Sequence, residues 1–256
     1  MAASVVPAAP TTRHPSIRAP HHTQQRVHPR TRAADLHLMF LGLHPATAAT
    51  AIILAGSGVR GFTILAPQKV TWDDAAAGAF DLPDIGLPRE YRLRRRVLAT
   101  NPQAVASSTP ATFPASTCEG TLIIRSRTLH DDEPPIPATV DENHRVLDII
   151  CPEEHPPGTT MLWPVRPWYA RACSVCIQET AGGSRRQPAR TARHEAWPSH
   201  TALTAALTAQ YVLATATEPS HATFDDTVTL LHPGAPMSEI EHRPSAQKTC
   251  ALCSPE

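Results

Sequence analysis

Hydrophobic residues along the chain occur in short groups, and two of these groups have helical spacing. In 199–215 a large side chain recurs at every fourth position, at Leu203, Leu207 and Tyr211. Ser199 precedes this group and can cap the helix. In 87–100, Pro88 stands near the start, and Tyr91, Val97 and Leu98 are apolar residues among five arginines. The pattern therefore predicts one helix in each of these two stretches.

The other apolar groups are shorter and extended in character, which is typical of strands. They cover 61–66, 69–72, 120–129, 144–151 and 226–231. Pro67-Gln68 separates the first two, so we expect them to form a hairpin. The third and fourth are expected to pair across the acidic, proline-rich loop 130–143.

Prolines interrupt this pattern throughout the chain. They number 27 of 256 residues, about twice their average usage, and each removes a backbone donor and disfavours helix before it. Aromatic residues make up 5%, and many of the apolar residues are alanines, which bury little surface. The fold class we predict is irregular and largely disordered with small α+β elements and no established superfold. Such a chain is an intrinsically disordered, proline-rich, low-complexity protein.

Composition divides the chain into segments. Residues 1–34 carry five Arg, four His, five Pro and no acidic residue, which predicts a disordered basic tail or, alternatively, an organelle-targeting segment. After this tail we expect a small apolar α+β segment at 35–100, a linker at 101–118, a short-strand segment with an acidic loop at 119–179, a basic linker at 180–198, a helix plus strand at 199–231, and a flexible end at 232–256.

Residues 36–59 contain no Asp, Glu, Lys or Arg and are long enough to span a bilayer. His37, His44 and Pro45 would then lie where hydrocarbon surrounds them. We therefore predict that this stretch is buried in the protein. A membrane-anchored or exported protein is the alternative.

Charge and cysteine content narrow the choice of partners. The formal net charge is zero, so no overall field attracts the chain to nucleic acid or membrane. The arginine cluster at 89–96 has no set of aromatic residues for base stacking and is interpreted as a solvated helix face. Two Cys-x-x-Cys pairs favour a reducing compartment. We therefore expect an intracellular protein, cytoplasmic or nuclear, with protein partners.

The two cysteine pairs are Cys173-Ser-Val-Cys176 and Cys250-Ala-Leu-Cys253. A two-residue gap lets both thiolates reach one ion, and two such pairs complete a tetrahedral zinc site. The 73 residues between the pairs exceed the usual separation of roughly 15–20 residues. The segment CSVCIQE resembles the opening of RING-type fingers, whose downstream Cys-x-His-x-x-Cys core this sequence lacks. Zinc is thus the candidate cofactor, and four ordinary thiols are the alternative.

A glycine motif, GSGVRG at 56–61, matches the Gly-x-Gly-x-x-Gly pattern of dinucleotide-binding turns. Those turns open a helix whose amides meet a phosphate. Here the next residues, FTILAP, have the character of a strand. The motif therefore does not by itself predict a dinucleotide site.

The longer stretch AIILAGSGVRGFTILAPQK, 51–69, resembles the start of the nucleotidyltransferase (sugar-nucleotide pyrophosphorylase) families. Their first strand runs into Leu-Ala-Gly-x-Gly-x-Arg, with Pro-Lys further on, and Gln68 departs from that pattern. The resemblance implies that two glycines line the nucleotide phosphates and that two cations counter their charge. These residues are Gly56, Gly58, Arg60 and Lys69.

No arrangement of nucleophile, base and acid can be singled out, so we name no catalytic residue and do not expect an enzyme. The leading hypothesis is a non-enzymatic intracellular interaction or binding protein with a structural four-cysteine zinc clip. The alternatives are a nucleotidyltransferase-like nucleotide-binding enzyme around 51–69, a membrane-anchored or exported protein, and a reading frame never selected for a fold. The sequence identifies neither a substrate nor a partner.

Overall fold

The computed structural model describes residues 33–110, 121–128, 137, 140, 144–151, 159–165, 176, 180, 198–217, 227–231 and 240–244. Their elements, in chain order, are η1 (Ala33–Asp35), β1 (His37–Leu41), α1 (Pro45–Gly56), β2 (Gly61–Leu65), α2 (Trp72–Ala76), η2 (Leu82–Asp84), α3 (Arg89–Thr100), β3 (Val105–Ser107), β4 (Thr121–Thr128), β5 (Arg145–Cys151), β6 (Thr160–Val165), α5 (Pro198–Thr217), β7 (Thr227–Leu231) and β8 (Glu241–Pro244).

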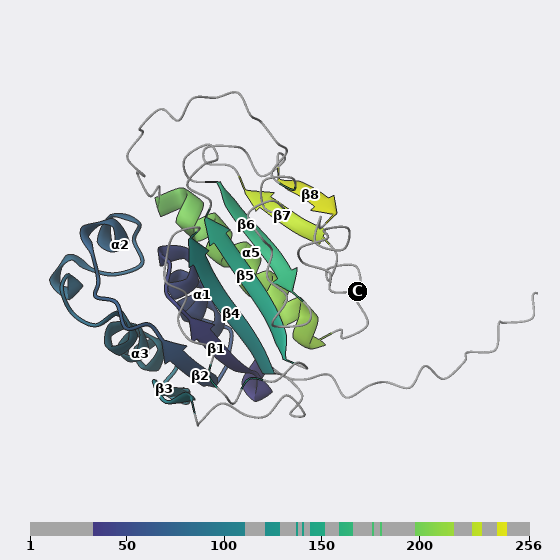
Figure 1. Cartoon of the computed structure of the whole chain (residues 1–256). Coiled ribbons are helices and arrows are strands. Elements are labelled where there is room, and N and C mark those ends of the chain that lie inside the picture. The colour runs from purple at the N-terminus through teal and green to yellow at the C-terminus, as the bar shows by residue number, and fades with distance from the viewer. Residues whose placement is uncertain are drawn as a thin grey trace, which may run out of the picture.

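The strands form one mixed sheet in the order β3-β2-β1-β4-β5-β6-β7-β8 (Figure 1). The first five strands of this order are parallel to one another, and β6, β7 and β8 are antiparallel to their neighbours. From β1 the chain runs outward to β2 and β3 and then returns to place β4 on the other side of β1. The order β3-β2-β1-β4-β5 is that of dinucleotide-binding α/β folds.

The topology confirms one of the two predicted strand pairs and corrects the other. The stretches 120–129 and 144–151 do form β4 and β5, but the two strands pair in parallel, with Ile124 opposite Leu147. Strand β2 pairs with β1 and β3, whereas 69–72 forms no strand: Lys69 makes an isolated bridge and Trp72 begins α2. Strands buried on both faces, as β4 and β5 are, are typical of parallel sheets.

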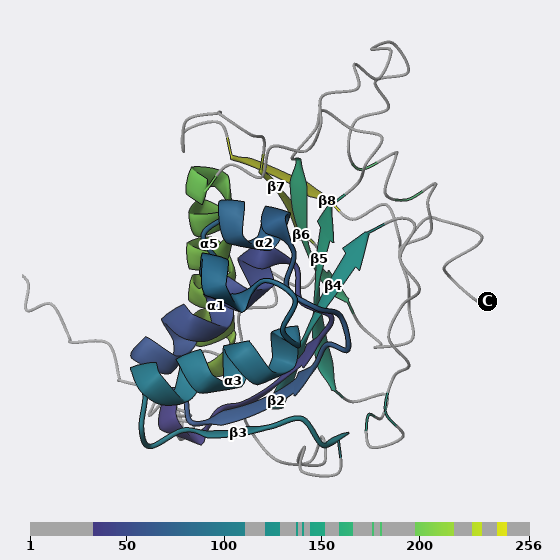
Figure 2. The ribbon, with the colours of Figure 1, turned by 90° about the vertical axis from the view of Figure 1, so that its left-hand side faces the viewer.

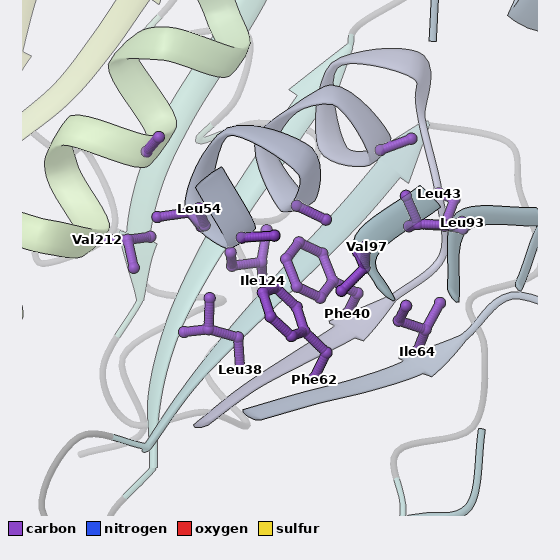
Figure 3. Packing of buried hydrophobic residues seen from close by; sticks show 14 of the residues in the cluster. Leu38, Phe40, Leu43, Leu54, Phe62, Ile64, Leu93, Val97, Ile124 and Val212 are labelled. Atoms are coloured by element: carbon purple, nitrogen blue, oxygen red, sulfur yellow. The ribbon is translucent and has the colours of Figure 1, made fainter. Parts of the chain in front are cut away.

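Helices α1, α3 and α5 lie on one face of the sheet (Figure 2). Alternate strand residues point at these helices and form the main core (Figure 3), among them Leu38, Phe40, Phe62, Ile64 and Ile124. The rings of Phe40 and Phe62, on neighbouring strands, stack with centroids 6.3 Å apart. One continuous apolar cluster thus joins the parallel strands to the three helices.

Small residues let α1 and α5 pack closely against each other. Ala48 and Ala51 on α1 and Ala205 and Ala209 on α5 are all buried. The Thr50 hydroxyl donates to the carbonyl of Ala46 at 2.8 Å, so its polar group is satisfied within its own helix. Alanine, which buries little surface by itself, here permits the close approach of two helices.

The prediction of an irregular, largely disordered chain with no established superfold is wrong, because the described residues form an ordered α/β sheet protein. The expectation of an intrinsically disordered, proline-rich, low-complexity chain fails with it. Several prolines lie where helices begin: Pro45 and Pro198 are the first residues of α1 and α5, and Pro88 is the N-cap of α3. A missing amide costs nothing at those positions.

The charge-free stretch 36–59 forms β1, the following turn and α1. None of the described helices combines the length and apolar character needed to cross a bilayer. The expectations of a basic tail and of organelle targeting concern residues 1–34, of which 1–32 lie outside the described residues and 33–34 belong to η1.

Candidate functional site

The topology places a candidate site at the carboxyl ends of β1 and β4. These strands are neighbours, but the chain leaves β1 toward β2 and reaches β4 only after the return from β3. In open α/β sheets, ligands bind outside the carboxyl ends of the strands at such a switch point. We use the word crevice for this switch point between the turn 42–44 and the end of β4, where the two segments are in contact.

Gly42 directly follows β1 and begins the turn of the crevice. Its φ is +72°, a conformation that suits glycine, and its amide donates to the carbonyl of Leu65 at 2.9 Å. A Cβ at this position would lie 3.3 Å from the carbonyl oxygen of Ser126 on β4. Glycine is therefore required here for the turn to approach the protein's own β4.

The N-terminus of α1, which faces the crevice, is capped by side chains of the protein. His44 is the N-cap, and its Nδ1 accepts from the amide of Ala46 at 3.3 Å. Pro45, the first helical residue, has no amide to offer. The His44 amide donates to Ser126 Oγ at 3.2 Å, and this hydroxyl also contacts Thr47 Oγ1 at 2.5 Å. The Ser126 hydroxyl thus occupies the position at the N-terminus of α1 at which a helix can bind an anion.

Other features of a dinucleotide turn are also missing. After β1 the sequence reads GLHPAT, which has the first glycine of the Gly-x-Gly-x-x-Gly pattern and not the other two. β2 ends at Leu65 and is followed by the buried Ala66 and by Pro67. Proteins that bind a nucleotide ribose at this place use an acidic residue. The crevice has no such carboxylate at the end of β2.

Arg89, in the first turn of α3, ties the crevice turn to α2. Its NH1 donates to the carbonyl of Leu43 at 3.0 Å, and its Nε donates to Asp74 Oδ2 at 2.9 Å. Asp74 is buried and also closes a capping box with Thr71 at the start of α2. The guanidinium is therefore committed to contacts within the protein.

A buried ion pair lies on the sheet face opposite the helices. Arg125 on β4 donates through Nε and NH2 to Asp148 on β5, at 2.6 Å and 2.7 Å. Arg127 adds a third contact to the same carboxylate at 3.3 Å. Arg125 and Asp148 are almost completely inaccessible to solvent. Two guanidinium groups therefore share one carboxylate at the carboxyl half of these strands.

At the end of β5, Cys151 begins a short chain of polar contacts. Its Sγ lies 3.8 Å from Thr160 Oγ1, and that hydroxyl lies 3.0 Å from Nε2 of His200 in the first turn of α5. Burial raises the pKa of the Cys151 thiol to about 11. The thiol is therefore protonated at neutral pH and is a poor nucleophile and metal ligand there.

The raised pKa of Cys151 predicts a loss of stability at alkaline pH. The unfolded thiol ionises near 9 and the folded one near 11, so the folded state holds its proton longer. The contribution of this group is complete below pH 9 and is lost as the pH rises through 11. We expect the urea midpoint of the wild type to fall more between about pH 8 and about pH 10.5 than that of Cys151→Ala. Parallel pH profiles of the two proteins would contradict this.

Three of the nucleotide-site residues suggested by the family resemblance lie together in the connection from α1 to β2, and the fourth, Lys69, lies beyond the other end of β2. Gly56 ends α1, Gly58 adopts φ +95° in the connection to β2, and Arg60 donates to Gln103 at 2.6 Å just before β2. Lys69 follows β2 at the opposite end of the strand. The glycine motif is thus the C-terminal cap of a helix.

Sequence reasoning missed the residues that do meet at the crevice, Gly42, His44, Arg89 and Ser126. The signal that could have found them is local. An apolar run, LHLMFL, is followed at once by Gly42 and then by Pro45. Strand, glycine turn and proline at the first helical position together indicate a β–turn–α unit.

The zinc clip is not supported. The part of the chain that the structure describes contains no group of three or more His, Cys, Asp or Glu side chains that could hold a metal ion. Cys176 is fully buried. Cys173, Cys250 and Cys253 lie outside the described residues. The described residues thus give no evidence for zinc binding, and the four-cysteine clip stays a prediction.

Comparison with known proteins identifies a fold but no family. No family model matches the chain, and no curated protein matches its sequence. Among solved structures, E. coli MccB aligns with a TM-score of 0.60 and 14% identity over 89% of this chain and 67% of MccB. MccB with ATP aligns with a TM-score of 0.58 and 14% identity over 88% and 68%. PaaA aligns with a TM-score of 0.52 and 14% identity over 84% and 73%.

MccB is a microcin C7 biosynthetic enzyme that has been solved with ATP and with MccA. The chain therefore has an α/β fold shared with a nucleotide-binding enzyme. Of the functions that the sequence left open, this fold supports the nucleotide-binding alternative more directly than the interaction protein. At 14% identity the likeness concerns the fold, and the residues of the crevice must decide how the fold is used.

Proposed function

We propose that this chain is a non-catalytic binding protein with the fold of a nucleotide-binding enzyme and with a crevice that does not accept ATP. One observation carries the proposal: Ser126 and His44 occupy the N-terminus of α1, at the switch point of the sheet. A phosphate bound there would have to displace both the capping imidazole and the serine hydroxyl.

The remaining contacts of the crevice support the same conclusion. The Arg89 guanidinium is held by the Leu43 carbonyl and by Asp74. The position after β2 that would hold a ribose carries the buried Ala66. Each feature removes one of the interactions from which nucleotide affinity in such folds is assembled: helix amides, a cation and an acidic residue.

A second candidate, nucleotide binding, is favoured by the likeness to MccB and by two cations at the same edge of the sheet. Lys69 is exposed beyond the end of β2, and Arg89 adjoins the crevice turn. If a triphosphate displaced the hydrogen bond between His44 and Ser126, its charge could be countered by Lys69 and Arg89, which lie in the loops at this edge of the sheet. This candidate therefore requires the crevice to rearrange.

Thermal melts with magnesium and ATP separate the two candidates. A ligand at about 100 times its Kd stabilises a protein by about 2.7 kcal/mol. We expect about 5 mM ATP, ADP or AMP to leave the Tm unchanged within about 1 °C, which excludes a Kd near roughly 50 µM. We also expect no release of phosphate or pyrophosphate from ATP.

The control is the same melt on Lys69→Ala and on an exposed-site variant, Asp73→Asn. A rise in Tm with ATP that Lys69→Ala abolishes and Asp73→Asn retains would establish the nucleotide-binding candidate and refute the non-catalytic one. Equal, small responses of all three proteins would support the proposal.

A further inference from the structure

Exposed apolar side chains are concentrated in one part of the structure. Of the seven large hydrophobic residues that are exposed among the described residues, five lie between positions 72 and 98: Trp72, Leu82, Leu87, Tyr91 and Leu98. This part is the excursion between β2 and β3, which contains α2, η2 and α3 and projects to one side of the sheet in Figure 1. Large apolar groups gathered in this way mark interaction surfaces.

Helix α3 has two distinct faces. Leu93 and Val97 are buried and pack into the core. Tyr91, Arg95 and Leu98 follow one another at spacings of four and three residues, lie on the opposite side, and are exposed. We call these three residues the outer face of α3. Its two apolar members, 48% and 39% exposed, stand on either side of an arginine.

Arg95 differs from the other four arginines of α3. Arg89 pairs with Asp74, Arg92 with Asp84, and Arg96 donates to the Ala79 carbonyl at 2.7 Å. Arg94 donates to the Ala106 carbonyl at 3.1 Å. Among the described residues, the contact found for Arg95 is with the ring of Tyr91, whose centroid lies 6.0 Å from the guanidinium carbon. One positive charge of the helix is therefore left facing solvent between two apolar groups.

We propose that the outer face of α3 binds an amphipathic helix of a partner protein that places a carboxylate against Arg95. This inference rests on the proposed function and names the surface through which the protein would bind its partner. The partner helix presents one acidic residue between two apolar residues, spaced four and three apart, so that each apolar side chain meets Tyr91 or Leu98. Arginine and carboxylate form paired hydrogen bonds, and the flanking apolar contacts exclude water from them.

The surface is rigid before the partner arrives. The ion pairs of Arg89 and Arg92 attach α3 to α2 and η2, and Leu93 and Val97 fix it to the core. Binding therefore need not order the helix backbone, which lowers its entropic cost. Tyrosine and arginine are also residue types that dominate binding energy at protein interfaces.

The test uses two fluorescent helical peptides of about 15 residues, long enough to form a helix, in a background of alanine and glutamine. One carries Leu-x-x-x-Glu-x-x-Leu on one face, and the other has Lys in place of Glu. By fluorescence anisotropy with the full chain, we expect the Glu peptide to bind about tenfold more tightly than the Lys peptide. Arg95→Glu should reverse this preference, and Tyr91→Ala should weaken binding of the Glu peptide by about fivefold or more.

Val105→Ala is the matched control, because Val105 is an exposed apolar residue on the edge strand β3 and does not belong to the outer face of α3. It should leave binding of both peptides unchanged, with a thermal melt to show that every variant is folded. Absence of binding at millimolar peptide, equal affinity for both peptides, or a Glu peptide that tolerates Arg95→Glu would overturn the proposal. If ATP binds the crevice and Arg95→Glu still reverses the preference between the two peptides, the proposed function is wrong, but the outer face of α3 is a peptide-binding surface.

Discussion

Replacing Asp148 by asparagine is expected to lower the free energy of unfolding by about 3–5 kcal/mol, the cost of breaking one side of a buried ion pair. Asp148 receives three contacts from Arg125 and Arg127, at 2.6 Å, 2.7 Å and 3.3 Å. Asparagine keeps the shape of the side chain but removes the negative charge. Arg125 and Arg127 would then lose the negative charge that both of them contact.

Urea unfolding at neutral pH measures this effect, with Asp73→Asn as the control. Asp73 is exposed at the start of α2, so its loss should change stability by less than about 0.5 kcal/mol. The double variant Arg125→Met with Asp148→Leu should recover most of the loss, because apolar residues of similar volume often replace a buried pair without penalty. A loss below about 1 kcal/mol for Asp148→Asn would show that the pair is solvated and not buried.

The two helices predicted from the sequence, α3 and α5, are those that have one face toward solvent. The stretch 199–215 became α5 and 87–100 became α3, because both have apolar positions at helical spacing next to a capping residue or proline. Strand positions were found in the same way at 61–66, 120–129 and 144–151. Local patterns reveal which residues are extended but not which strand is the neighbour. The expected pair of 120–129 with 144–151 did form, although in parallel, and the expected hairpin of 61–66 with 69–72 was wrong.

The unit β1–α1 was missed because it is buried on nearly every side. Its strand and most of its helix are inaccessible to solvent, so neither the period of a strand nor that of a helix is visible between 37 and 56. The stretch therefore resembled one apolar span. Gly42 and Pro45, at the end of the strand and the start of the helix, were the only local marks of the boundary.

The charge contacts around the site could not be inferred from the sequence either. The arginine cluster of α3 was interpreted as a solvated face. Arg89 pairs with Asp74 of α2, however, and Arg92 pairs with Asp84 of η2. Their spacing of three residues places them on one face of α3, but only the folded excursion brings the aspartates to it. Arg125 and Asp148, 23 residues apart, likewise meet only because β4 and β5 pair in parallel.

Replacing Gly61 by alanine is expected to lower the free energy of unfolding by about 3 kcal/mol, at the upper end of the usual cost of inserting atoms into a packed region. In the β1–β2 register Gly61 lies opposite His37. A Cβ at position 61 would lie 2.6 Å from Cγ, 2.7 Å from Nδ1 and 2.9 Å from the backbone α-carbon of His37. The imidazole is held in place by a contact of its Nε2 with Thr63 Oγ1 at 3.0 Å.

The comparison variant is Gly86→Ala, because a Cβ at Gly86 meets nothing within 4 Å. Gly86 has φ +84°, so its alanine variant should show only the cost of a left-handed conformation, about 1–2 kcal/mol.

The double variant His37→Ala with Gly61→Ala should recover part of the loss, since the imidazole is gone but the backbone of β1 still lies 2.9 Å from the new methyl group. Full recovery would mean that β1 and β2 can shift apart. No loss for Gly61→Ala alone would mean that His37 and Gly61 are not opposite each other. The turn at Gly42 follows the same strand, so the crevice depends on the register that this pair of variants tests.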